Sequence, residues 1–384
     1  VATGINIGTG VLVSQLFGAK RYLRMKTAIS TALRTTTTVA LLLTLIGAIG
    51  THGIMNALST PENIFADGSL YLRVYVFGLL FLFIYNVCTG IFNAMGDSRT
   101  PLFLLILSSV GNVILDVVFV AMLHWGVAGV AWATFIAQGA SGVFAFFLLM
   151  RRVRTFDTGH HFILFAPEML RRLTNYAIPS IAQQSFVSVG NLIIQYYVNL
   201  CGPTVIAGFS VANRINMFAL TCCMSFASGL SSYVAQNIGA RKPRRVLSSM
   251  YVSLFWALSF GVVFGVLSCV FGTQLLGLYS PDPAVIQVGL NRMYIVCGPY
   301  FLCGIMDLFP GALRGMGCSA VPMILSVIGT VGTRIVWIFG IFPQHRSLYV
   351  LFISYPGSWI ITIIMQVICY LIMRKKVHSR AAAV

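Results

Sequence analysis

Long uninterrupted apolar stretches alternate with short polar connections along the whole chain of 384 residues. A helix needs about 20 apolar residues to cross the roughly 30 Å hydrocarbon core of a bilayer. Runs long enough for one transmembrane helix each lie at residues 28–50, 68–93, 101–123, 126–150, 174–199, 203–232, 247–272, 287–312, 320–342 and 349–373. Residues 1–17 form an eleventh, incomplete run. The pattern predicts an all-α polytopic membrane protein and excludes an outer-membrane barrel, whose strands are short and alternate apolar with polar positions.

Charge is scarce and unevenly distributed. Hydrophobic residues make up 58% of the chain and charged residues 9%, against about a quarter in an ordinary soluble domain. The net charge of +17 does not indicate a nucleic-acid partner, because the Lys and Arg residues lie in short clusters between the apolar runs. Every second connection is rich in them, whereas the alternate connections contain only Arg346. The positive-inside rule therefore predicts a multi-pass protein of the bacterial-type cytoplasmic (plasma) membrane with a cytoplasmic C-terminus.

Two segments in the connections repeat at a constant displacement of 221 residues. The sequence VSQLFGAK, beginning at Val13, recurs as VAQNIGAR from Val234. Gly90, Met95, Gly96 and Pro101 likewise match Gly311, Met316, Gly317 and Pro322. Both copies face the same side, which predicts two pseudo-symmetric bundles related by a parallel repeat, with substrate between them.

This repeat also predicts how the chain is divided. An N-terminal lobe is expected at residues 1–150, a cytoplasmic linker at 151–172 and a C-terminal lobe at 173–384. The first lobe is expected to lack about one and a half helices of a twelve-helix, six-plus-six fold, because Val1 corresponds to a position partway along a span of the second lobe.

Charged groups within hydrocarbon cost roughly 3 kcal/mol or more each, so those inside the spans are functional candidates. Only two of the eight carboxylates, Asp116 and Asp307, lie there. Asp116 shares a helix face with Asn112 one turn earlier, and Thr134 on the next helix lies at a similar depth. These oxygen ligands suit a proton or a hard monovalent cation, which predicts an ion-coupling site. The alternative is a hydrogen bond that only joins two helices.

The second half carries a polar stripe along one apolar helix, formed by Gln184, Ser188, Asn191 and Gln195. A stripe of this kind is typical of a helix that lines a wet cavity. We expect substrate to be bound by Gln184, Asn191, Gln195, Asp307, Arg214 and Arg334. From their depths, Asp307 is expected to pair with Arg214. Three further arginines near helix ends can extend to the membrane surface instead: Arg34, Arg73 and Arg292.

Several motifs taken together resemble the multidrug and toxic compound extrusion (MATE) transporters. They are VxQxxGA, GxxxxMGDSRTP at residues 90–101, the stretch from Asn112 to Asp116, and GVAGVAWAT at residues 126–134. The segment LFPGALRG after Asp307 resembles a second-lobe helix of some members.

The resemblance implies two six-helix bundles and antiport of organic, often cationic, compounds against Na⁺ or H⁺. It also implies a cation site at Asn112, Asp116 and Thr134, the positions that match an Asn, an Asp and a Thr of the family's first lobe. The family's first helix usually supplies a further carboxylate that this sequence does not contain, so the coupling ion stays open.

We therefore expect a monomeric secondary active transporter in the lipid bilayer, not an enzyme, that exports a small molecule and needs no cofactor besides Na⁺ or H⁺. Two alternatives remain. A flippase for a lipid-linked saccharide or peptidoglycan precursor would use Arg214 and Arg334. A membrane-embedded enzyme would have to use His160 and His161 beside Asp157. The nine cysteines show no metal-binding spacing.

Overall fold

The computed structural model describes residues 1–57, 62–156, 158, 161–344 and 347–382. Within these ranges every regular element is a helix. Nine of the helices are long and apolar enough to cross a membrane, or ten when the bent pair Pro283–Cys297 and Tyr300–Gly315 counts as one span. The expected spans are confirmed to within seven residues at each end, and α1 (Ala2–Gly18) is a shorter helix of 17 residues.

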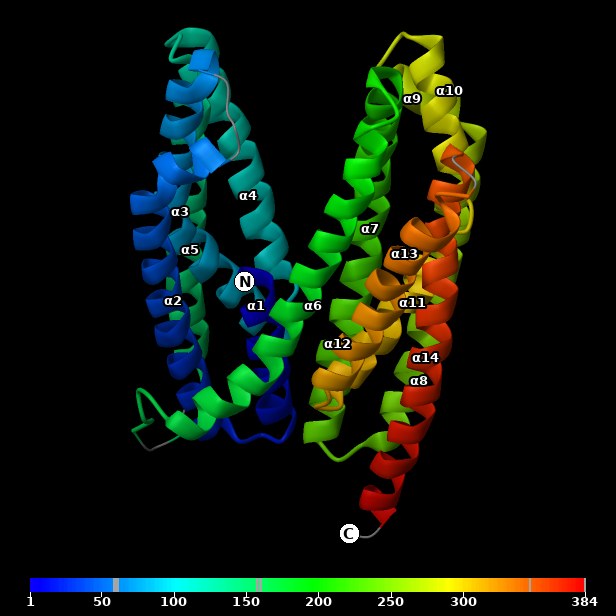
Figure 1. Cartoon of the computed structure of the whole chain (residues 1–384). Helices are drawn as coiled ribbons and strands as arrows, with labels where there is room; N and C mark the ends of the chain where they lie inside the picture. The colour runs from blue at the N-terminus through cyan, green and yellow to red at the C-terminus, as the bar shows by residue number, and fades with distance from the viewer. Residues whose placement is uncertain (58–61, 157, 159–160, 345–346, 383–384) are drawn as a thin grey trace. The chain divides into compact units, whose positions relative to one another are not determined.

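The chain forms two compact units, Val1–Ala177 and Ile178–Val384. The first contains α1, α2 (Tyr22–Ala57), α3 (Glu62–Ala94), α4 (Arg99–Asp116), the π-helix η1 (Val117–Met122), α5 (Gly126–Arg154) and the start of α6 (Pro167–Asn199). In this unit α3 is central, because it packs against α1, α2 and α5, and α4 packs against α5 (Figure 1). The core side chains of α3, such as Val87, Cys88 and Ile91, are fully buried.

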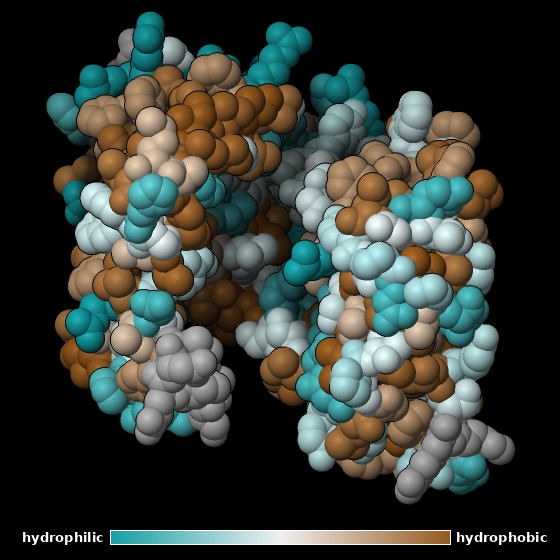
Figure 2. Space-filling view, turned by 90° about the horizontal axis from the view of Figure 1, so that it is seen from above, coloured by the Kyte–Doolittle hydropathy of each residue, from teal (hydrophilic) through white to brown (hydrophobic). Residues whose placement is uncertain are grey.

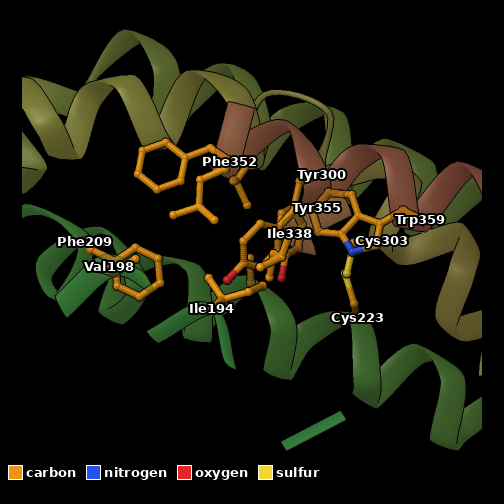
Figure 3. Packing of buried hydrophobic residues seen from close by; sticks show 13 residues of the cluster. Ile194, Val198, Phe209, Cys223, Tyr300, Cys303, Ile338, Phe352, Tyr355 and Trp359 are labelled. Carbon is orange, nitrogen blue, oxygen red and sulfur yellow. The ribbon is translucent and has the colours of Figure 1, made fainter. Parts of the chain in front are cut away.

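The second unit has the same plan with α11 at its centre, packed against α7, α8 and α14 (Figure 1). Its elements are the rest of α6, α7 (Pro203–Gly239), α8 (Pro243–Val270), α9 (Gly272–Gly277), α10 (Pro283–Arg292), η2 (Met293–Cys297), α11 (Tyr300–Gly315), α12 (Ala320–Ser326), η3 (Val327–Gly332), α13 (Thr333–Val336), η4 (Trp337–Ile341) and α14 (Leu348–Ala382). Figure 3 shows part of its core, where Phe209, Tyr300, Tyr355 and Trp359 gather among aliphatic side chains.

Backbone details repeat between the units at the displacement found in the sequence. Lys20 and Arg241, 221 positions apart, both have φ of 56°. Gly96 and Gly317, also 221 apart, have φ of 82° and 90°, a conformation that favours glycine. The crossing of the central helix with one neighbour, α3 with α1 and α11 with α7, repeats as well. A side chain added at Gly90 would collide with Asn6, and one at Gly311 would lie 2.6 Å from the carbonyl oxygen of Ala227, the residue 221 positions after Asn6. The two units therefore share one design.

Large apolar side chains are exposed along the helices of both units. On α4 alone, Leu102, Phe103 and Ile106 are each more than half exposed. In Figure 2, seen from above, brown apolar side chains are interspersed with teal and white ones on both units. Exposed apolar surface of this extent is unfavourable in water but is what hydrocarbon chains require. The helix surfaces therefore identify a polytopic membrane protein independently of helix length.

Candidate functional site

Asp116 lies where the backbone of α4 changes to the π-helical segment η1. Such segments are frequent at functional sites, because the wider turn breaks the regular hydrogen-bond ladder. The side chain is half-buried, and its Oδ1 atom is buried without a hydrogen-bond partner. One turn earlier, Nδ2 of Asn112 is also buried and without a partner. Two buried polar atoms that lack partners on one helix face mark a place where a ligand can supply the missing contacts.

Thr134 lies half-buried on α5, the helix that packs against α4 and η1. Contact between α5 and η1 is close at Gly129, where an added side chain would come within 3.1 Å of the Phe119 backbone. Within the described part of the chain, no hydrogen bond joins Thr134 to Asn112 or Asp116. The alternative of a simple hydrogen bond between helices is therefore not what the structure contains.

The charge at this site suits a monovalent ion. Among the described residues, no three His, Cys, Asp or Glu side chains cluster as a divalent metal would need. A single carboxylate with nearby amide and hydroxyl groups can instead be neutralised by one proton or one Na⁺ ion. The assignment of Asn112, Asp116 and Thr134 to ion coupling stays a prediction at this point.

The predicted stripe on α6 lies in the second unit as one continuous face. Gln184 and Gln195 are half-buried, whereas Asn191 is exposed. Ser188 donates to the Gln184 carbonyl at 2.9 Å, and Gln195 donates to Asn199 at 2.8 Å. Asn191 accepts a hydrogen bond of 3.1 Å from Nη1 of Arg334, so two of the predicted substrate residues do meet.

Arg334 is held from three sides on the short helix α13, between η3 and η4. It is 5% exposed, and its Nε donates to Ser358 Oγ at 3.3 Å on α14. Its guanidinium carbon also lies 4.3 Å from the centre of the Tyr355 ring, a cation–π distance. The residue is therefore part of the interior of the unit.

Arg292 is a second interior cation, and the expectation that it extends to the membrane surface is wrong. It is 1% exposed and stacks on Phe209 at 4.3 Å, while its Nη2 donates to Asn213 at 3.1 Å. The sequence does indicate that Arg292 is buried, because it lies on one helix face with the apolar residues Val285, Gly289 and Val296. All three are buried in the structure. A charge on the buried face of a helix cannot reach the surface however near the helix end it lies.

A second polar stripe, which the sequence analysis missed, lies on α14. Ser354, Ser358, Thr362 and Gln366 follow one another every four residues and are all 0% exposed. Opposite them Ser326, Thr330 and Arg334 also repeat every four residues. Gln366 and Gln183 both donate to Ser326, at 2.9 and 3.0 Å, and the Thr330 and Thr362 hydroxyls lie 3.3 Å apart. The second unit therefore contains a hydrogen-bonded polar column in its interior.

Asp307 lies on α11, with Oδ2 buried and lacking a hydrogen-bond partner. Its expected pairing with Arg214 is wrong. Arg214 is exposed, and its guanidinium lies 5.9 Å from the centre of the Tyr279 ring. Arg314 lies two turns along the same helix from Asp307, and its Nε donates to the Pro310 carbonyl at 3.1 Å. Depth along a helix brought Arg214 and Asp307 to similar levels, but it does not fix the direction in which a side chain points.

Of the His and Asp cluster that an enzyme would use, the structure describes only His161. Asp157, His160 and Arg346 lie outside the described residues, and His161 is exposed. The nine cysteines are free thiols.

Comparison with known proteins gives the same family in three ways. The MatE family model matches residues 1–118 and 179–339, one segment in each unit. A probable multidrug resistance protein of Bacillus subtilis, YoeA, is 26% identical over 94% of this chain and 80% of its own length. The multidrug export protein MepA of Staphylococcus haemolyticus is 25% identical over 85% of this chain and 72% of its own length.

Solved structures of similar fold include a MATE protein in a bent conformation, with a TM-score of 0.87 and 18% identity over 99% of this chain and 85% of that one. A second is a transporter of the MOP superfamily from Pyrococcus furiosus, described as having a binding pocket of reverse polarity. Its TM-score is 0.85, and it is 20% identical over 100% of this chain and 84% of its own. With a family model that matches most of the sequence, this chain belongs to the MatE family of membrane transporters.

Proposed function

We propose that this protein is a secondary active exporter that exchanges organic, cationic compounds for Na⁺ or H⁺. The observation that carries the proposal is Asp116, an intramembrane carboxylate with a buried oxygen that has no hydrogen-bond partner among the described residues. Ionisable groups inside membranes are costly unless they bind or relay ions. The names of the relatives YoeA and MepA, which describe multidrug resistance and export, support the same role.

The coupling step would be the neutralisation of Asp116. A proton or Na⁺ ion bound there, with Asn112 and Thr134 as neighbours, removes a net negative charge from the membrane interior. Ion binding can drive transport only if it favours one conformation over the other, because a ligand with equal affinity for both shifts nothing. Typical coupling free energies are about 1–3 kcal/mol, or ~5–150-fold in affinity.

Substrate contacts are proposed for the polar residues of the second unit. Gln184 and Gln195 offer neutral hydrogen-bonding groups, and Asp307 offers a negative charge for a cationic compound. Asn191 offers a further neutral group, although it already bonds Arg334. Arg214 and Arg334 would contact an acidic group of the compound, because their charge repels a cation. The charge bias of the connections supports insertion in the cytoplasmic membrane with the C-terminus inside.

Efflux of a fluorescent organic cation from proteoliposomes tests the proposal. With Na⁺ and pH gradients applied separately, Asp116→Asn is expected to lower gradient-driven efflux at least about tenfold, within the usual range of coupling. The matched control is Asp67→Asn, which changes an exposed carboxylate of the same unit and should transport normally. Gradient-driven efflux by Asp116→Asn at the wild-type rate would refute the coupling role.

A further inference from the structure

Two buried guanidinium groups in the second unit have no acidic partner among the described residues. Arg292 and Arg334 are 1% and 5% exposed. The one ion pair among the described residues joins Arg172 to Glu168, two exposed side chains of α6. A charge enclosed in a helix bundle is stable only when it is paired, so two positive charges without a counter-ion are unusual.

The two arginines are close enough to act on each other. Both guanidinium groups lie over the ring of Tyr355, at 4.3 Å for Arg334 and 5.8 Å for Arg292. Both groups are positively charged and both lie within 6 Å of the same ring centre, so they repel each other. One anion bound between them would change this repulsion into two attractions.

Neutral hydrogen-bond partners hold the two arginines in place but do not satisfy all of their N–H donors. Asn191 and Asn213 each accept one hydrogen bond, from Arg334 and Arg292 respectively. Two of the three nitrogens of Arg292, Nε and Nη1, remain buried without a partner. Charged donors are expensive to leave unbonded, so these atoms indicate a missing acceptor.

The backbone around both arginines is irregular in the same way. Arg292 directly precedes the π-helix η2, and Arg334 lies between η3 and η4. The helix that carries Arg292 also bends by 47° between η2 and α11. Irregular helical turns of this kind are frequent at functional sites, which fits a ligand site at these arginines.

We propose that Arg292 and Arg334, which both lie against the Tyr355 ring, form a binding site for one oxyanion group, a carboxylate or a phosphate. Planar guanidinium groups favour these anions because they can donate two parallel hydrogen bonds. The ring of Tyr355 and that of Phe209, both visible in Figure 3, form the apolar walls. The group can belong to a free inorganic ion or to an acidic compound that the protein carries. The site lies in the second unit and does not depend on ion coupling at Asp116.

Calorimetric titration of the purified chain in detergent tests the site without any transport step. The probes are inorganic phosphate and benzoate, each at constant ionic strength and constant Na⁺ concentration. Saturable binding of either probe is expected, with a rise in Tm because the anion binds only the folded protein. Binding of phosphate alone would identify a free ion, and binding of benzoate alone would identify an organic acid. The absence of both binding and a Tm shift in the wild type would overturn the proposal.

Variants then assign the binding to the two arginines. Arg292→Gln and Arg334→Gln should each weaken binding at least about tenfold, because each removes a charged donor. Arg334→Lys should retain weaker binding, since it keeps the charge but loses the planar fork. Arg245→Gln, at an exposed arginine of the same unit, is the control and should bind like the wild type. Unchanged binding by folded Arg292→Gln and Arg334→Gln would contradict the assignment, and so would equal loss in the control.

Discussion

Single residues distinguish the two units where the backbone is the same. Asp307 on α11 stands 221 positions after Asn86 on α3, so one unit has a carboxylate where the other has an amide. Asn86 bonds its own helix, donating to the Leu82 carbonyl at 2.8 Å, whereas Asp307 keeps one oxygen without a partner. A satisfied polar group stabilises a fold, but an unsatisfied one costs stability and is retained for another reason.

Asp97 is a polar residue whose hydrogen bonds are satisfied and stabilise the fold. It lies in the turn before α4 and accepts hydrogen bonds from the Arg99 and Thr100 amides, at 3.2 and 3.1 Å, and from the Thr100 hydroxyl at 2.8 Å. Partial burial alone would raise the pKa of Asp97, but these bonds, together with the charge of Arg152, lower it below its ordinary value. The ionised carboxylate therefore caps the start of α4.

Replacing this cap should have a pH-dependent effect. Asp97→Ala is expected to cost about 1 kcal/mol of stability at pH 7, as the loss of a helix cap usually does. Because the pKa is lower in the folded protein, the stabilisation is present above the ordinary carboxylate pKa of about 4 and is lost as the pH falls through the folded value. Thermal denaturation of wild type and variant from pH 7 to pH 3 should show the two Tm values converging. A constant difference would mean that the carboxylate charge has no role.

At the residue scale, the sequence identifies charged residues within apolar runs, but it did not predict the directions of their side chains. An Asp or Arg that interrupts an apolar run is visible in the sequence, which is how Asp116, Asp307 and Arg334 were found. Which way a side chain points depends on which face of its helix is covered. That face was misjudged for Arg292, which is buried, and for Arg214, which is exposed.

At the scale of elements, the predicted apolar runs lie in helices because a chain crosses the bilayer as a helix with about 20 apolar residues, although α2 and α7 extend to 36 and 37 residues. The π-helical segments η1 to η4 could not be predicted, since an added residue in a helical turn leaves no mark on composition. Two of them nevertheless obey the repeat. The segment η1 begins at Val117, directly after Asp116, and η4 begins at Trp337, which lies 221 positions after Asp116. The irregular backbone at the candidate ion site is therefore a feature of the shared design.

The crossing of α7 and α11 provides a test of element packing. An added methyl group at Gly311 would lie 2.6 Å from the backbone oxygen of Ala227, which cannot move as a flexible side chain could. Gly311→Ala should therefore lower stability by roughly 1–3 kcal/mol, the usual cost of overpacking. Gly229→Ala on α7, where the same methyl group meets nothing within 4 Å, is the matched control and should be neutral or slightly stabilising. Equal Tm values for the two variants would show that this crossing is not tightly packed.

At the scale of the whole molecule, the sequence alone predicted an all-α membrane protein built from two related halves, and both features are confirmed. The lengths of the apolar runs predicted the membrane spans, and the constant displacement of 221 residues predicted the two related halves. The polar column between α14 and the segment α12 to α13 was not predicted. Serine and threonine are common in apolar helices, and only the burial of these residues together shows that they form a column. Both units therefore combine an apolar outer surface with buried polar groups, as a transporter requires.

The most direct test of the central claim measures ion and substrate movement together. Proteoliposomes containing the chain are loaded with a fluorescent organic cation and placed in medium without it, with no ion gradient applied. Outward movement of the compound should drive Na⁺ or H⁺ inward in a fixed ratio, recorded with an ion-sensitive dye, and Asp116→Asn should abolish that ion movement. Substrate movement with no accompanying ion flux, or an unchanged ratio in Asp116→Asn, would contradict the account.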